Sequence, residues 1–136
     1  MVDRTRSDGN GHWLPGAAHE LTTMELLAVA LAAFTGVVHF FMAYEELGEL
    51  GESLLFLVAG VVFFAGVVLF VRDHWPRWLF LVGAVFTAVQ IPLWILEGME
   101  EFPIGVTDKA AQAALVVVLL VLFWQTSARN RAQRAD

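Results

Sequence analysis

Four long runs of apolar residues, separated by short polar segments, dominate the sequence. They lie at about 23–44, 53–71, 76–97 and 107–126, and each is close to the roughly 20 residues that an α-helix needs to cross the hydrocarbon core of a bilayer. Backbone groups in lipid must be hydrogen-bonded within the protein, so runs of this length favour helices. The pattern predicts an all-α membrane protein, an antiparallel bundle of four transmembrane helices.

The two ends of the chain are polar. Residues 1–22 mix charge, glycine and proline without apolar periodicity and predict a flexible tail, while residues 127–136 predict a basic tail. The long polar segment before a full-length first run indicates an anchor that stays in place, not a cleaved signal peptide. Thr22 and Glu25 have the spacing of a capping box at the start of the first helix. Thr107 and Asp108 suit the start of the fourth.

Basic residues are distributed unevenly between the two sides that four spans define. Seven arginines precede the first run, separate the second from the third, or follow the fourth, whereas the other side has only Lys109. Cytoplasmic loops carry an excess of Lys and Arg. We therefore predict a multi-pass protein of the cell membrane with both termini in the cytoplasm. The outer side then carries Glu45, Glu46, Glu49, Glu52, Glu97, Glu100, Glu101 and Asp108.

Composition excludes several classes of function. The chain has no cysteine, so it can form no disulfide, thiolate metal site or cysteine nucleophile. A net charge of −6 and scattered arginines argue against nucleic acid as a partner. No nucleophile elbow, P-loop, dinucleotide-binding fingerprint or zinc-protease motif occurs. We expect no enzymatic activity and no cofactor, and the lipid bilayer is the one certain partner.

The polar residues inside the spans are the candidate site. Counted along the helical rise, His39, Gln90 and Gln112 lie within about 6–10 Å of the outer ends of three different helices. Glu97 and Asp108 lie just above them. Polar side chains in a membrane usually turn inward and pair, so we expect these five to meet near the bundle axis.

Two interpretations of this candidate polar pocket stay open. In the first, the side chains hydrogen-bond between helices and fix their register, each contact contributing about 0.6–2 kcal/mol. In the second, His39 exchanges protons or binds a ligand group in a pocket open to the outside. A metal site is not predicted, because no two candidate ligands share the spacing of helical metal motifs. Haem held by two histidines of one chain is strongly disfavoured, because the other three histidines lie near the opposite side.

Small residues recur four apart on the first run, at Ala28, Ala32 and Gly36. This spacing lets another helix approach closely, either within the chain or from a second copy in a homo-oligomer.

One resemblance follows from particular segments: GVVHFF in the first run, QIPLW at Gln90–Trp94, and PIGVTDKAAQAAL at the start of the fourth. With these segments the chain resembles a group of functionally uncharacterised small four-helix membrane proteins common in haloarchaea. The resemblance implies the four-span fold and a recurrent setting of His39, Gln90 and Gln112, but no activity. A looser architectural similarity exists to DoxX-like proteins. Small multidrug transporters have a carboxylate midway along their first helix, which is neutral here.

The sequence therefore favours a non-enzymatic structural or interaction subunit of the membrane. The alternative is a small transporter or proton-coupled carrier that uses the polar pocket, and a weaker one is an accessory subunit for a quinone or similar redox ligand.

Overall fold

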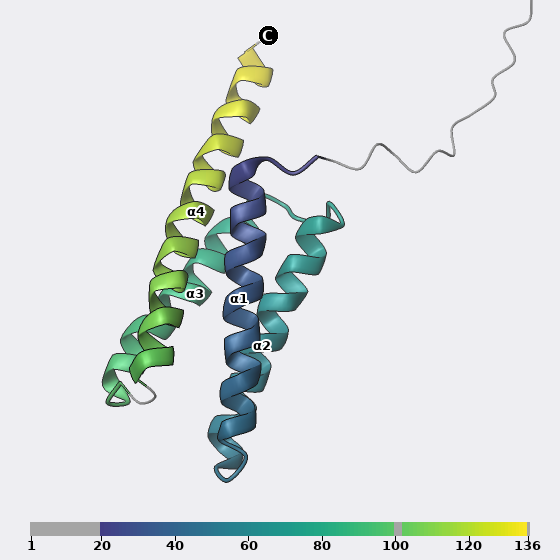
Figure 1. Cartoon of the computed structure of the whole chain (residues 1–136). Helices are drawn as coiled ribbons and strands as arrows, with labels where there is room; N and C mark the ends of the chain where they lie inside the picture. Colours follow the sequence, from purple (N-terminus) through teal and green to yellow (C-terminus); the bar gives the residue numbers. More distant parts are fainter. Residues whose placement is uncertain (1–19, 100–101, 136) are drawn as a thin grey trace, which may run out of the picture.

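The computed structural model describes residues 20–99 and 102–135, which form four helices: α1 (Thr23–Glu45), α2 (Leu50–Val71), α3 (Trp78–Leu96) and α4 (Phe102–Ala135). Within these ranges there is no strand, and short turns join the helices. All four helices are long and apolar enough to cross a membrane. The predicted all-α, four-transmembrane-helix fold is confirmed (Figure 1).

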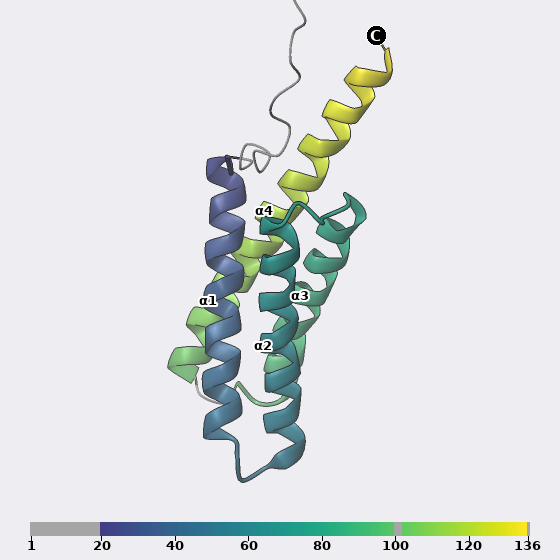
Figure 2. The same ribbon diagram turned by 90° about the vertical axis from the view of Figure 1, so that its right-hand side faces the viewer.

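The bounds of α4 differ most from those expected. It begins at Phe102 and runs to Ala135, so it includes residues predicted as loop and most of the predicted basic tail. Pro103 falls in its first turn, where a missing N–H breaks no helical hydrogen bond. The Thr107 hydroxyl donates to the Pro103 carbonyl at 3.0 Å, so Thr107 lies inside the helix and does not cap it. The end of α4 extends beyond the other helices (Figures 1 and 2).

The start of α1 follows the sequence prediction. The Glu25 N–H donates to the Thr22 hydroxyl at 3.3 Å, and the Glu25 carboxylate accepts from the Thr22 N–H at 2.8 Å. The predicted capping box is therefore present. The predicted N-terminal tail lies almost entirely outside the described residues.

The helices pack in the order α2, α1, α4, α3. Helix α1 packs against α2 and α4, and α4 packs against α3, whereas α2 and α3 make at most a marginal contact. They are joined by a short turn at one end and diverge from it (Figure 1). A buried cluster that draws on all four helices forms the core: Ala28, Phe63, Phe80, Ala84, Leu115, Val118, Leu119 and Leu122. The bundle is thus closed on three sides, whereas α2 and α3 meet mainly through aromatic side chains such as Phe63 and Phe86.

Two glycines bring α1 and α2 close together. A Cβ on Gly36 would lie 2.8 Å from the Phe64 ring, and a Cβ on Gly60 would lie 2.7 Å from the Phe40 ring. The two rings stack with 5.5 Å between their centroids. Gly36 and Ala28 are buried inside the chain, so the stripe of small residues serves packing within one molecule. A contact between copies through Ala28, Ala32 and Gly36 stays a prediction.

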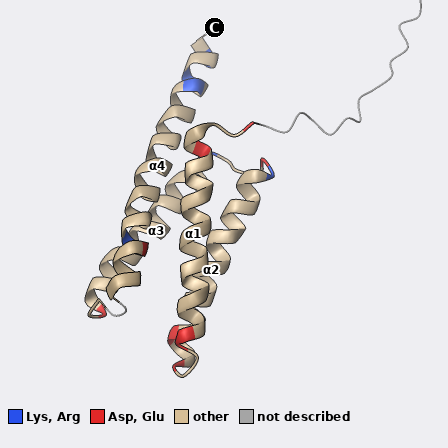
Figure 3. Cartoon of the chain, viewed as in Figure 1, with Lys and Arg blue, Asp and Glu red and all other residues tan. Residues whose placement is uncertain are grey.

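Charged residues separate along the bundle. Acidic side chains gather at the turn between α1 and α2, and basic ones lie on the far part of α4 (Figure 3). The separation is incomplete, because Glu25 and Asp73 lie at the same end as the arginines, and Lys109 lies near the acidic end beside Asp108.

Candidate functional site

Polar residues from three helices meet between α1, α3 and α4, near the end where α1 turns into α2. We call His39, Gln90, Asp108, Lys109 and Gln112 the polar cluster. His39 is 4% exposed, Asp108 3% and Gln112 0%, and Gln90 is half-buried. Four of the five residues predicted for the site therefore lie together inside the protein.

Gln112 links α4 to α3. Its side-chain amide donates to Gln90 Oε1 at 3.2 Å and to Asp108 Oδ2 at 2.8 Å. Asp108 and Gln112 are four residues apart on α4, so their side chains lie on one face of that helix. Gln90 Nε2 in turn donates to the Phe86 carbonyl at 3.0 Å. One amide thus joins two helices and holds a carboxylate.

Asp108 is a buried carboxylate with a cation beside it. Lys109 Nζ lies 2.9 Å from Asp108 Oδ2, the oxygen that also accepts from Gln112. The Lys109 side chain is 13% exposed, against 4% for that of Asp108. The long lysine stem lets the ammonium group neutralise the carboxylate while it reaches toward the surface. A buried charge is tolerated in this way because it is paired and hydrogen-bonded.

His39 stands between the polar cluster and α2. Its Nδ1 lies 2.8 Å from the Thr35 carbonyl oxygen, one turn back on α1. A carbonyl only accepts, so Nδ1 carries a hydrogen, and in the neutral ring Nε2 is then the acceptor. On the α2 side the ring packs against Phe56 and Phe63, with centroids 6.0 Å and 5.4 Å away. On the other side it interacts with the Gln90 side chain and, electrostatically, with Asp108 and Lys109.

Three buried oxygens in this region have no hydrogen-bond partner in the described part of the chain: Thr35 Oγ1, Asp108 Oδ1 and Gln112 Oε1. An unsatisfied buried polar group costs about 1–3 kcal/mol. Asp108 Oδ1 and Gln112 Oε1 can only accept, so each could take a hydrogen bond from water or another donor, and the carboxylate oxygen could take a proton. The polar cluster therefore has spare acceptor capacity.

Glu97 is the predicted site residue that does not join the polar cluster. It is exposed and forms the C-cap of α3, with its backbone N–H bonded to Leu93 O. Helix α3 ends before it, so the helical face that carries Gln90 does not extend to the Glu97 side chain. The neighbouring Glu100 and Glu101 lie outside the described residues. Among residues 20–99 and 102–135, no three histidine or acidic side chains gather as metal ligands.

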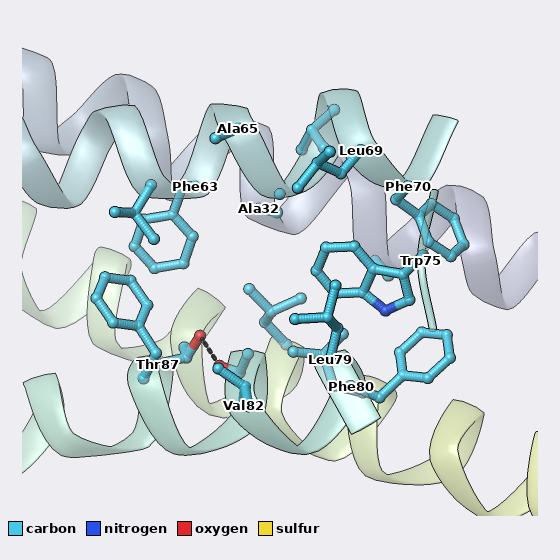
Figure 4. Close-up of a pocket in the computed structure, with 18 of the residues that line it drawn as sticks. Ala32, Phe63, Ala65, Leu69, Phe70, Trp75, Leu79, Phe80, Val82 and Thr87 are labelled. Atoms are coloured by element: carbon cyan, nitrogen blue, oxygen red, sulfur yellow. Dashed lines mark hydrogen bonds between the residues drawn. The ribbon is translucent and has the colours of Figure 1, made fainter. Parts of the chain in front are cut away.

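An apolar crevice of about 300 Å³ lies where α2 and α3 diverge. Figure 4 shows Phe63, Ala65 and Leu69 of α2 facing Leu79, Val82 and Thr87 of α3 across it. The Thr87 hydroxyl donates to the Gly83 carbonyl at 2.8 Å, so the crevice is lined almost wholly by carbon. The hydropathy pattern does not predict this crevice. Its only signal was a small residue on each helix, Gly66 and Gly83.

Trp75 closes the crevice at the end nearest the turn between α2 and α3. Its ring makes edge contacts with Phe70 and Phe80, each with 5.9 Å between centroids. A Cβ on Gly66 would lie 3.6 Å from this ring, and one on Gly83 would lie 4.0 Å from it. The indole therefore fits between the two helices where both lack a side chain.

The comparisons with known proteins agree with this description without adding an activity. No curated protein and no solved structure matches the chain significantly. One sequence family covers most of the chain, including α1, α2, α3 and the part of α4 that carries the polar cluster. The chain belongs to the family of unknown function DUF7475, whose sequence profile matches residues 17–123.

Proposed function

We propose that this multi-pass membrane protein is a non-enzymatic structural or interaction subunit of the cell membrane. The observation that carries the proposal is the hydrogen bonding of Gln112. This side chain is fully buried and uses both amide hydrogens within the chain, on Gln90 of α3 and Asp108 of α4. Such bonds fix the register of helices in lipid, where apolar surfaces alone specify it poorly.

The other members of the polar cluster support the same role. His39 is bonded to its own helix and packed against two phenyl rings of α2. Lys109 neutralises Asp108 instead of standing free for chemistry. Each contact joins or steadies helices, and none presents a nucleophile next to a base.

We also propose that both termini lie in the cytoplasm, because the arginines gather on that side. The chain has no native cysteine, so single cysteines can report its orientation. We expect Gly48→Cys, in the turn between α1 and α2, to react with a membrane-impermeant maleimide on intact cells. Ala135→Cys, at the end of α4, should react only after permeabilisation. The reverse labelling would overturn the orientation.

A proton-coupled carrier is the second candidate, favoured by the unpartnered acceptors Asp108 Oδ1 and Gln112 Oε1. In that case Asp108 and His39 would exchange protons with the outer side. A proton arriving at Asp108 Oδ1 would weaken its pairing with Lys109 and free the Gln112 amide to rotate.

Proton flux separates the two candidates. The purified protein is reconstituted in liposomes that contain a pH-sensitive dye, and a pH gradient is applied across the membrane. The structural proposal expects the same leak as from empty liposomes for the parent and for Asp108→Asn. Flux in the parent that Asp108→Asn abolishes, with His39→Ala impaired, would select the carrier.

We further propose a haloarchaeal type for this chain. An acidic, lysine-poor surface suits that assignment: 14 Asp and Glu residues stand against eight basic ones, of which one is lysine.

A further inference from the structure

A small basic pocket lies at the end of the bundle opposite the polar cluster. Arg77, at the start of α3, and Ser127, Asn130, Arg131 and Arg134 of α4 enclose about 110 Å³ there. This is several times the roughly 30 Å³ that one water occupies. The α4 residues recur at three- and four-residue steps, so they share one face of that helix.

None of the three arginines of this pocket forms an ion pair with a residue that the structure describes. The one ion pair found in the described part of the chain joins Lys109 to Asp108, far from the pocket. Arg77 instead lies over the Phe123 ring, with its guanidinium carbon 4.6 Å from the ring centroid. This stacking holds Arg77 against α4, where Arg131 and Arg134 also lie. Three positive charges therefore surround one hollow with no counter-ion among residues 20–99 and 102–135.

The depth of the pocket along the helices indicates what supplies that counter-ion. Trp78 begins α3 and is 60% exposed, and Trp124 of α4 is 63% exposed. Large exposed tryptophans at the ends of apolar spans mark the interface between hydrocarbon and headgroups. Arg77 directly precedes Trp78, and Ser127 follows Trp124 by less than one turn. Arg131 and Arg134 follow Trp124 by seven and ten residues, or about 10 and 15 Å along the helix. The pocket therefore extends outward from the level of the tryptophans through the headgroup region.

We propose that this pocket binds the phosphate of an anionic membrane lipid, with Arg77, Arg131 and Arg134 as its ligands. Guanidinium groups suit phosphate because they offer paired N–H donors in a fixed plane. Basic pockets between transmembrane helices are a known form of lipid recognition. This proposal also explains why α4 extends beyond the other helices, because the extension carries Arg131 and Arg134 into the headgroup region.

The test measures lipid binding to the full chain in detergent by native mass spectrometry. The probes are short-chain phosphatidylglycerol, which is anionic, short-chain phosphatidylcholine, which is zwitterionic, and inorganic phosphate. We expect phosphatidylglycerol to bind more tightly than phosphatidylcholine. A basic residue near a membrane surface contributes roughly enough for a fivefold change in affinity. Arg131→Gln and Arg134→Gln should each weaken phosphatidylglycerol binding by about that factor.

Arg129→Gln is the matched control. It removes the same charge from the same helix, but Arg129 is two residues from Arg131, nearly opposite around α4, and does not line the pocket. The affinity of the Arg129→Gln variant for phosphatidylglycerol should equal that of the parent protein. Arg131→Lys, which keeps the charge but not the planar fork, should retain most of the affinity and guards against a folding defect in Arg131→Gln.

Two results would overturn the proposal. Equal losses in Arg129→Gln and Arg131→Gln would show attraction by scattered charge and not by a pocket. Displacement of phosphatidylglycerol by inorganic phosphate at equal concentration would assign the pocket to a soluble anion and not to a lipid.

Discussion

Replacing Gln112 by leucine tests whether the polar cluster holds the helices together. Leucine has similar size but removes the donor that reaches both Gln90 and Asp108. Interhelical hydrogen bonds in membranes contribute about 0.6 kcal/mol on average and up to about 1.7. Loss of the hydrogen bond to Gln90 should therefore lower the free energy of unfolding by about 0.6–1.7 kcal/mol.

The second consequence of this change falls on Asp108. Its Oδ1 already has no partner in the described chain, and Oδ2 would keep only Lys109. Leaving a buried acceptor under-satisfied costs about 1–3 kcal/mol. The two losses sum to about 2–5 kcal/mol. The change also removes Gln112 Oε1, which has no partner in the described chain and whose loss offsets part of this cost, so we expect a net destabilisation of Gln112→Leu of about 1 kcal/mol or more.

Unfolding of the purified protein in mixed micelles, followed by the fluorescence of its five tryptophans, measures this loss. Gln125→Leu is the matched control, because Gln125 lies on the same helix but is exposed. A double-mutant cycle with Gln90→Leu should give a coupling of about 0.6–1.7 kcal/mol, since the two amides contact each other directly. If Gln112→Leu unfolds within about 0.5 kcal/mol of the parent, the register-fixing role is refuted.

The same unfolding assay checks three further predictions. Gly36→Leu should destabilise the protein by at least about 2 kcal/mol, because its Cβ alone would lie 2.8 Å from the Phe64 ring. Gly48→Leu should be nearly neutral, because nothing lies within 4 Å of a Cβ there. Thr22→Ala should cost about 1 kcal/mol by removing the cap of α1. Phe63→Ala should cost about 3–5 kcal/mol, since this ring is 6% exposed and belongs to the core.

A particular result would contradict each of these three predictions. A Gly36→Leu protein as stable as the parent would mean that α1 and α2 can separate without cost. Thr23→Ala, one position beyond the cap, should leave stability unchanged, and an equal loss there would point to a general effect on the tail. Phe41→Ala removes an exposed ring of the same type, so a loss as large as that of Phe63→Ala would contradict the assigned core.

Position along the sequence was enough to place most of the polar cluster. Once four spans were recognised, the helical rise converted residue number into depth, and Gln90 and Gln112 came out at one level. Their contact then followed, because polar groups in lipid seek each other. The capping box of α1 was equally local, since its residues are three apart in sequence.

Features that depend on where a helix stops, or on which helices pair, were not predictable in this way. Glu97 shares a helical face with Gln90 only while the helix continues, and α3 ends just before it. The polar residues after Thr126 read as a tail, yet Ala, Arg and Gln are good helix formers and α4 continues through them. The apolar crevice depends on the pairing order of the helices, and hydropathy carries no information about that order.

The packing order α2, α1, α4, α3 also divides the protein into two parts. Polar contacts hold α4, α3 and α1 together, whereas α2 is held mainly by apolar packing. The polar cluster ties α4 to α3 and reaches α1 through His39. Within the described part of the chain, one side-chain hydrogen bond joins α2 to a neighbouring helix, from the Ser53 hydroxyl to the Ala43 carbonyl near the turn. Otherwise glycine and ring contacts hold it to α1, and ring contacts of Phe63 with Phe86 and of Phe70 with Phe80 link it to α3 beside the crevice. The width of the crevice therefore depends on how α2 packs on α1 and on these ring contacts, and not on the polar cluster, so a change at Gly36 should alter the crevice before it disturbs the polar cluster.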